Sequence, residues 1–99
     1  MTPKIAIPHD QIAAFCTRHH IKRLALFGSV LRDDFRADSD IDILVIFEEG
    51  KTPGLEYFSM EEELSGILGR RVDLSTPGFL SQYFRDEVLT TAHDLYVKS

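Results

Sequence analysis

The sequence predicts an α/β (α+β) fold, in which a mixed β-sheet is flanked by helices within a single small domain spanning residues 1–99. Stretches of helical periodicity alternate with short apolar runs, and this alternation is typical of a sheet covered by helices. Hydrophobic residues make up 43% of the chain, as in ordinary globular proteins. Ninety-nine residues suffice for one core and leave no room for a separate recognition module.

The first part of the chain predicts a helix, a strand and a short second helix. Apolar residues at helical spacing predict an amphipathic helix over residues 10–20. The short apolar run of residues 22–27 precedes a glycine and predicts a buried strand. Ser29 is expected to cap a short helix that ends at Asp33, before a polar loop over residues 34–39.

The middle of the chain predicts a strand, a helix and a second strand. Residues 41–47 are the strongest strand candidate, and residues 48–54 form a turn-rich connection. A helix is expected over residues 55–68 with Gly69 at its C-cap, and a short strand over residues 71–75. The acidic run of residues 61–63 is expected on the solvated face of this helix.

The last part predicts one long helix and an extended segment. Thr76 is expected to cap the helix, with Pro77 at its first position, and the helix should end near Ala92. Residues 94–97 then form an extended segment. The expected apolar face of the helix consists of Leu80, Tyr83, Phe84, Val88 and Leu89.

The Gly28-Ser29 pair stands where a buried strand leads into a helix. Glycine lets a phosphate approach the backbone closely, and the serine hydroxyl adds a donor. Taken alone, the pair is more often a plain turn.

Asp40 and Asp42 lie two residues apart, so a strand aims both carboxylates to one side. At about 6.6 Å they repel by roughly 2–3 kcal/mol at an effective dielectric of 20, a cost that a divalent cation reverses. The alternative is a solvated strand start. Together with the upstream Gly28-Ser29 at this spacing, the pair favours a phosphate-and-metal site.

Asp73 is the third candidate acid, within the predicted strand of residues 71–75. Its neighbours Val72 and Leu74 are expected in the core, so Asp73 should point to the opposite face. If this strand lies beside residues 41–47, three carboxylates converge and can bind two metal ions. Asp73 could also accept the proton of an attacking hydroxyl.

The string Gly28-Ser29, ten residues, Asp40-Ile41-Asp42, followed by Asp73, resembles the DNA polymerase β-like nucleotidyltransferase superfamily. Residues 27–42, 71–74 and 83–89 resemble the minimal nucleotidyltransferases more closely, a family of antitoxins whose partners are HEPN-domain toxins. The resemblance extends from about Ile12 to Tyr96.

This resemblance implies a Mg²⁺-dependent enzyme, with two ions, that transfers AMP from ATP to a tyrosine of a HEPN ribonuclease toxin and so acts as its antitoxin. It implies that Gly28, Ser29 and Arg32 bind the nucleotide. It also implies that Asp40, Asp42 and Asp73 bind metal and carry the catalysis. Asp33 departs from the glycine of many relatives, which leaves the shape of the local loop in question.

Two alternatives stay open. The chain can be an antitoxin that neutralises its partner by binding alone, with vestigial catalysis. It can also be a small-molecule nucleotidyltransferase of the antibiotic-modifying kind, although no acceptor domain is present in this short sequence.

Charge and composition limit the partners. The net charge is -5, with 11 basic and 16 acidic side chains and scattered arginines, so stable nucleic-acid binding is not expected. The sequence has no apolar run long enough for a membrane span and no secretory signal, and its one cysteine excludes an internal disulfide. These features predict a cytoplasmic protein without membrane association.

Overall fold

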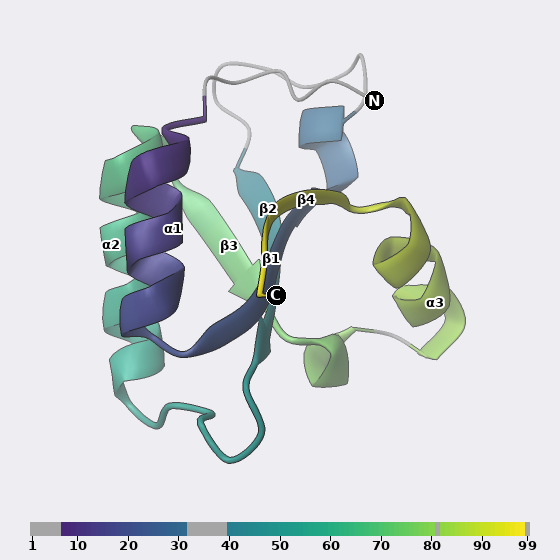
Figure 1. Cartoon of the computed structure of the whole chain (residues 1–99). Coiled ribbons are helices and arrows are strands. Elements are labelled where there is room, and N and C mark those ends of the chain that lie inside the picture. Colours follow the sequence, from purple (N-terminus) through teal and green to yellow (C-terminus); the bar gives the residue numbers. More distant parts are fainter. Residues whose placement is uncertain (1–6, 32–39, 81, 99) are drawn as a thin grey trace.

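The computed structural model describes residues 7–31, 40–80 and 82–98. Its centre is a four-stranded mixed sheet with strand order β3-β2-β1-β4 (Figure 1). The elements are α1 (His9–Arg18), β1 (Ile21–Phe27), the 3₁₀ helix η1 (Gly28–Leu31), β2 (Ile41–Phe47), α2 (Glu56–Leu68), β3 (Val72–Ser75), the 3₁₀ helix η2 (Pro77–Phe79), α3 (Gln82–Thr91) and β4 (His93–Val97). The predicted mixed sheet flanked by helices is therefore confirmed.

The connections explain the strand directions. β2 runs antiparallel to β1, whereas β3 runs parallel to β2 because α2 carries the chain back between them. β4 closes the other side of the sheet by pairing antiparallel with β1. The central strands are thus β1 and β2, and the edges are β3 and β4.

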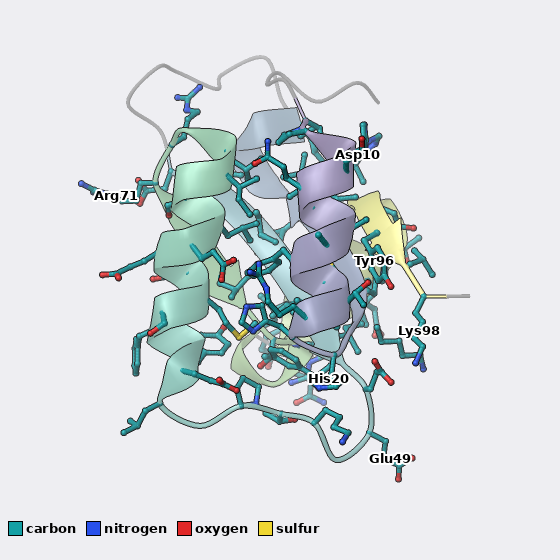
Figure 2. The ribbon with its side chains drawn as sticks, turned by 60° about the vertical axis from the view of Figure 1, so that its left-hand side comes forward. Asp10, His20, Glu49, Arg71, Tyr96 and Lys98 are labelled. Carbon is teal, nitrogen blue, oxygen red and sulfur yellow. The ribbon has the colours of Figure 1, made fainter. Side chains whose placement is uncertain are left out.

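The two faces of the sheet are covered differently. α1 and α2 lie side by side over one face, and α3 lies on the other (Figures 1 and 2). Arg18 and His19 both pair with Glu63 of α2, with His19 Nε2 at 3.1 Å from Glu63 Oε1, and so tie the C-terminal end of α1 to the middle of α2.

The main core lies between the sheet and the α1/α2 layer. Its fully buried side chains alternate along β1 and β2, as expected for strands with two different faces. It includes Ile12, Phe15, Cys16, Leu24, Leu26, Ile41, Ile43, Val45, Met60 and Leu64. Burial raises the pKa of the Cys16 thiol to about 12, which makes this thiol an unreactive part of the core.

A smaller core lies under α3. Leu44 points away from the main core and packs with Leu80 and Val88, and Phe27 and Leu89 pack partly against them. Asp42 lies on the same face of β2 as Leu44, because residues two apart on a strand share a face. The α3 side of the sheet therefore carries both a small apolar cluster and an acidic residue.

The predicted single helix over residues 76–92 is wrong, because η2 and α3 are separate. Between them Leu80 has an extended backbone, with φ -83° and ψ 145°, and its side chain is buried in the small core. Gly78 favours the break, since glycine is a poor helix former. Tyr83, expected on the apolar face, is 98% exposed. The side chain of Phe84 lies outside the described part.

Other predictions are close to the observed elements. Pro77 begins η2 as expected, although Thr76 makes no capping hydrogen bond through its side chain. Gly69 ends α2 in the left-handed conformation, with φ 71°. The short helix begins at Gly28 rather than after Ser29, so Ser29 lies within η1. The predicted end of that helix at residue 33 and the predicted loop over residues 34–39 lie outside the described residues.

Within residues 7–31, 40–80 and 82–98, none of the helices combines the length and apolar character that crossing a membrane requires.

Candidate active site

Gly28 directly follows β1 in a conformation that only glycine adopts easily, with φ +77°. A Cβ atom at this position would lie 2.4 Å from Oδ2 of Asp42 and 3.3 Å from its Cγ. The Asp42 carboxylate is therefore packed directly against the backbone of the turn. Any side chain at residue 28 would push this carboxylate away.

Asp42 lies on the central strand β2, between two neighbours in register. Its partner on β1 is Phe27, and its partner on β3 is Asp73. Side chains of paired residues point to the same face of a sheet. The carboxylates of Asp42 and Asp73 thus lie on one face, on adjacent strands, with Asp42 half-buried and Asp73 exposed.

Asp40 precedes the first residue of β2 and is exposed, with 46% of its side chain accessible. Its Oδ1 lies 3.9 Å from Nη1 of Arg71, a residue that points away from the body of the molecule (Figure 2). An exposed pair at this distance contributes little to stability. The structure therefore brings Asp42 and Asp73 together and leaves Asp40 beside them, turned toward Arg71.

The acidic residues fit a magnesium ion as a pair rather than as a closed cage. Among the residues that the structure describes, no group of three or more His, Cys, Asp or Glu side chains could hold a metal ion. Mg²⁺ usually keeps several waters and takes one or two carboxylates together with substrate phosphates. Asp42 and Asp73 supply hard oxygen donors of this kind, and the Asp42 carboxylate lies directly against the backbone of the Gly28 turn.

The other two residues predicted to bind the nucleotide are Ser29 and Arg32. The backbone of Ser29 directly follows Gly28 in η1, as the predicted phosphate turn requires. Arg32 lies outside the described residues, so its expected contact with phosphate stays a prediction.

Sequence analysis did not predict that side chains of α2 bond to the backbone of β3 on both sides of Asp73. The predicted solvated role of Glu61 is wrong, because its Oε2 accepts a hydrogen bond from the backbone N–H of Leu74, next to Asp73, at 2.9 Å. Tyr57 and Ser65 also bond to the backbone of β3. The four-residue spacing of Tyr57, Glu61 and Ser65 was the available signal, since it places them in one row along a helix.

Comparison with known proteins agrees with this geometry. A family model described as a nucleotidyltransferase domain matches residues 10–94. A protein of Methanocaldococcus jannaschii, to which the role of a protein adenylyltransferase is assigned, is 36% identical over 85 residues, covering 86% of this chain and 90% of the relative. The protein adenylyltransferase MntA of Thermococcus cleftensis is 45% identical over 58 residues, covering 58% of this chain and 57% of the relative.

Solved structures give the same fold. A chain assigned as a minimal nucleotidyltransferase superposes with a TM-score of 0.70 at 40% identity, over 85% of each chain. A toxin–antitoxin complex with AMP-PNP superposes with a TM-score of 0.72 at 21% identity, over 94% of this chain and 76% of that chain. A complex of a tri-AMPylated HEPN toxin from Shewanella oneidensis with its MNT antitoxin gives a TM-score of 0.64 at 22% identity, over 91% and 70%.

Proposed function

Because this chain belongs to the nucleotidyltransferase domain family, we propose that it is a protein adenylyltransferase that transfers AMP from ATP to a tyrosine of a HEPN-domain toxin. In this role it acts as the antitoxin of that toxin. The observation that carries the proposal is the register of β2 and β3, which sets Asp42 opposite Asp73 beside the Gly28 turn.

The relatives support a protein as the acceptor. The Methanocaldococcus jannaschii relative, nearly all of whose length is matched, is assigned as a protein adenylyltransferase. Two solved structures of the same fold contain AMP-PNP and an AMPylated HEPN toxin, and ATP as the donor and a HEPN protein as the acceptor are proposed for this chain by analogy with them.

In the proposed reaction the phenolic oxygen of the acceptor tyrosine attacks the α-phosphorus of ATP. The new P–O bond forms as the bond from the α-phosphorus to the bridging oxygen breaks, and pyrophosphate leaves with the electron pair. The Asp73 carboxylate accepts the phenolic proton. Asp73 is the exposed residue of the edge strand β3, and this exposure suits a bulky protein acceptor, because a tyrosine on another chain can reach it.

The residues of the Gly28 turn orient the triphosphate. The absence of a side chain at Gly28 lets the Asp42 carboxylate lie against the turn, so a metal ion held by Asp42 would lie close to the turn, whose N–H groups can donate to phosphate oxygens. Asp40, Asp42 and Asp73 would hold the Mg²⁺ ions, which lower the negative charge that the phosphates present to the nucleophile. Two ions, ATP rather than another nucleotide and a cytoplasmic location all belong to this proposal.

The test combines the protein with ATP, Mg²⁺ and the purified HEPN protein encoded beside it, and measures the toxin by intact mass spectrometry. A mass increase of AMP units on a tyrosine is expected. Asp42→Asn should reduce transfer by at least about a hundredfold, because it removes a ligand that would position the metal and the triphosphate. Circular dichroism should show that the variant is folded.

Asp10→Asn is the matched control, because Asp10 is exposed on α1, outside the proposed site. It should transfer AMP at the wild-type rate. Transfer by Asp42→Asn at the same rate would reject the metal role of the acids. If the double variant Asp40→Asn/Asp42→Asn still neutralised the toxin fully in cells, neutralisation by binding alone would be the better account.

A further inference from the structure

The outer edge of β3 is occupied by side chains of α2. β3 is an edge strand, and within the described part of the chain the backbone groups that face away from β2 have no neighbouring strand. The Leu74 N–H donates to Glu61 Oε2 at 2.9 Å, and the Leu74 carbonyl accepts from the Tyr57 hydroxyl at 2.7 Å. The Val72 N–H donates to Ser65 Oγ at 3.0 Å.

These three side chains form one row on α2. Tyr57, Glu61 and Ser65 are spaced four residues apart, so they project from the same side of the helix. Ser65 is itself held in place, since its hydroxyl donates to the carbonyl of Glu61 at 2.8 Å while it accepts from Val72. We call Tyr57, Glu61 and Ser65 the α2 clamp.

The α2 clamp binds the residues on both sides of Asp73. Along a parallel edge strand the backbone groups of alternate residues point inward and outward, so Val72 and Leu74 face α2 while Asp73 bonds toward β2. Four residues of β3 pair with β2, and a slip of one residue would turn Asp73 to the other face. The α2 clamp therefore fixes the register of β3 against β2, and this register decides whether Asp73 lies on the same face as Asp42.

The Tyr57 hydroxyl is suited to a constant role as donor. Burial, followed by the negative charges of Glu61 and Asp73, raises the pKa of Tyr57 to about 12. The phenol therefore stays protonated over the working range of an enzyme, and its hydrogen bond to the Leu74 carbonyl persists.

We propose that Glu61, supported by Tyr57 and Ser65, is a positioning residue that keeps the Asp73 carboxylate opposite that of Asp42. This proposal rests on the function proposed above. Glu61 acts through the Leu74 N–H and through strand register, so it contacts neither the nucleotide nor the acceptor. Its carboxylate serves as a hydrogen-bond acceptor, a role that a glutamine oxygen can also fill.

The variants separate the role of Glu61 as a hydrogen-bond acceptor from its negative charge. Glu61→Ala removes the acceptor, whereas Glu61→Gln keeps an acceptor oxygen on a side chain of the same length. Glu62→Ala is the matched control, because Glu62 is the next residue of α2 and is exposed. Amide hydrogen exchange at Leu74, measured without nucleotide, should be about tenfold faster in Glu61→Ala than in Glu61→Gln, Glu62→Ala and the wild type.

The decisive measurement is the affinity for Mn²⁺, used as a paramagnetic probe of the acidic site. Glu61→Ala should weaken Mn²⁺ binding about tenfold, as is typical when a group that orients a metal ligand is removed. Glu61→Gln should restore most of the affinity. In an Asp73→Asn background, Glu61→Ala should cause no further loss, because a residue that acts only through Asp73 has nothing left to position.

Two results would overturn the positioning role. One is an unchanged Mn²⁺ affinity in Glu61→Ala, and the other is an equal loss with and without Asp73, which would indicate a general structural effect. A wild-type protein that failed to bind Mn²⁺ at all would instead reject the metal role of the acids in the proposed function, and the positioning role with it. AMP transfer should follow the same order, with kcat/KM for ATP lowered in Glu61→Ala and largely restored in Glu61→Gln.

Discussion

At the scale of single residues, the site depends on the close approach of the Asp42 carboxylate to Gly28. Gly28 has a positive φ, and Oδ2 of Asp42 lies 2.4 Å from the position that a Cβ would take at residue 28. The pattern of Gly28, Asp40, Asp42 and Asp73 was visible in the sequence because of the combination and its spacing, since each residue alone is common in turns or at solvated strand ends. The contact between Gly28 and Asp42 could not be predicted from the sequence, because it depends on how β1 and β2 pair.

Gly28→Ala should therefore be more damaging than the same change at Gly50, its matched control. Gly50 has a nearly identical φ of +76°, but a Cβ atom there would meet no described atom within 4 Å. Both variants bear the strain of a left-handed alanine, about 1 kcal/mol. Gly28→Ala must also displace Asp42, so we expect a total loss near 2–3 kcal/mol in urea unfolding and at least about a tenfold loss of AMP transfer.

Gly50→Ala should keep wild-type transfer. Equal stability losses and equal transfer in the two variants would mean that the Asp42 carboxylate does not need the space beside residue 28.

Glu61 illustrates the limit of sequence reasoning at this scale. An acidic residue in an acidic run predicts a solvated position, because side-chain type is the only information available. Its partner is the backbone of Leu74, and a backbone N–H has no signature in the sequence. The role of the α2 clamp could therefore be found only once α2 and β3 were placed side by side.

At the scale of elements, periodicity predicted most helices and strands to within one or two residues. The strand over residues 41–47 was correct at both ends, because an apolar stretch of this length, interrupted only by Asp42, is too short for a typical helix. The division of the last helix into η2 and α3 was missed. Local sequence favours one helix after Pro77, whereas burial of Leu80 against Leu44 requires an extended residue between the two.

Arg23 joins three elements, and its loss should loosen the α3 side of the sheet. From β1, its Nε donates to Asp94 of β4 at 2.6 Å and its Nη1 donates to the carbonyl of Leu89 in α3 at 3.1 Å. Hydrogen bonds to charged groups contribute about 1.5–3 kcal/mol each when shielded, and the Asp94 side chain is 46% exposed. We therefore expect Arg23→Ala to cost about 2 kcal/mol in urea unfolding.

Lys22→Ala is the control, since Lys22 is exposed on the same strand and should change stability by less than about 0.5 kcal/mol. Arg23→Lys should recover only part of the loss, because an ammonium group cannot reach both acceptors as a guanidinium does. If Arg23→Ala and Lys22→Ala were equally stable, the two hydrogen bonds would contribute nothing measurable.

At the scale of the whole molecule, the fold class and the family were both predicted correctly. The family model matches residues 10–94, close to the range over which the sequence resembles minimal nucleotidyltransferases. The order of the strands, in contrast, could not be predicted from the sequence. It depends on pairing between strands far apart in the sequence, such as β1 with β4, which local patterns do not encode.

Binding of Mg²⁺ and ATP should stabilise the whole domain, because the site joins the ends of three neighbouring strands. At a ligand concentration about 100 times the Kd, the free energy of unfolding should rise by about 2.7 kcal/mol. For a domain of this size the melting temperature should then increase by roughly 10–20 °C in differential scanning fluorimetry.

Removing the metal with EDTA while ATP is kept should abolish most of this increase, and Asp42→Asn should behave as the wild type does with EDTA. An undiminished increase in the presence of EDTA would contradict metal-assisted nucleotide binding.

The position of β4 has a consequence for how the chain is made. β1 lies between β2 and β4, and the bond from Arg23 to Asp94 joins residues 71 positions apart. On the ribosome, β1 with the Gly28 turn after it, β2 with Asp42 and β3 with Asp73 emerge before β4, so the acidic half of the sheet can form early. Until residues 93–97 follow, one side of β1 is an open strand edge, and a nascent chain in that state is exposed to pairing with other chains.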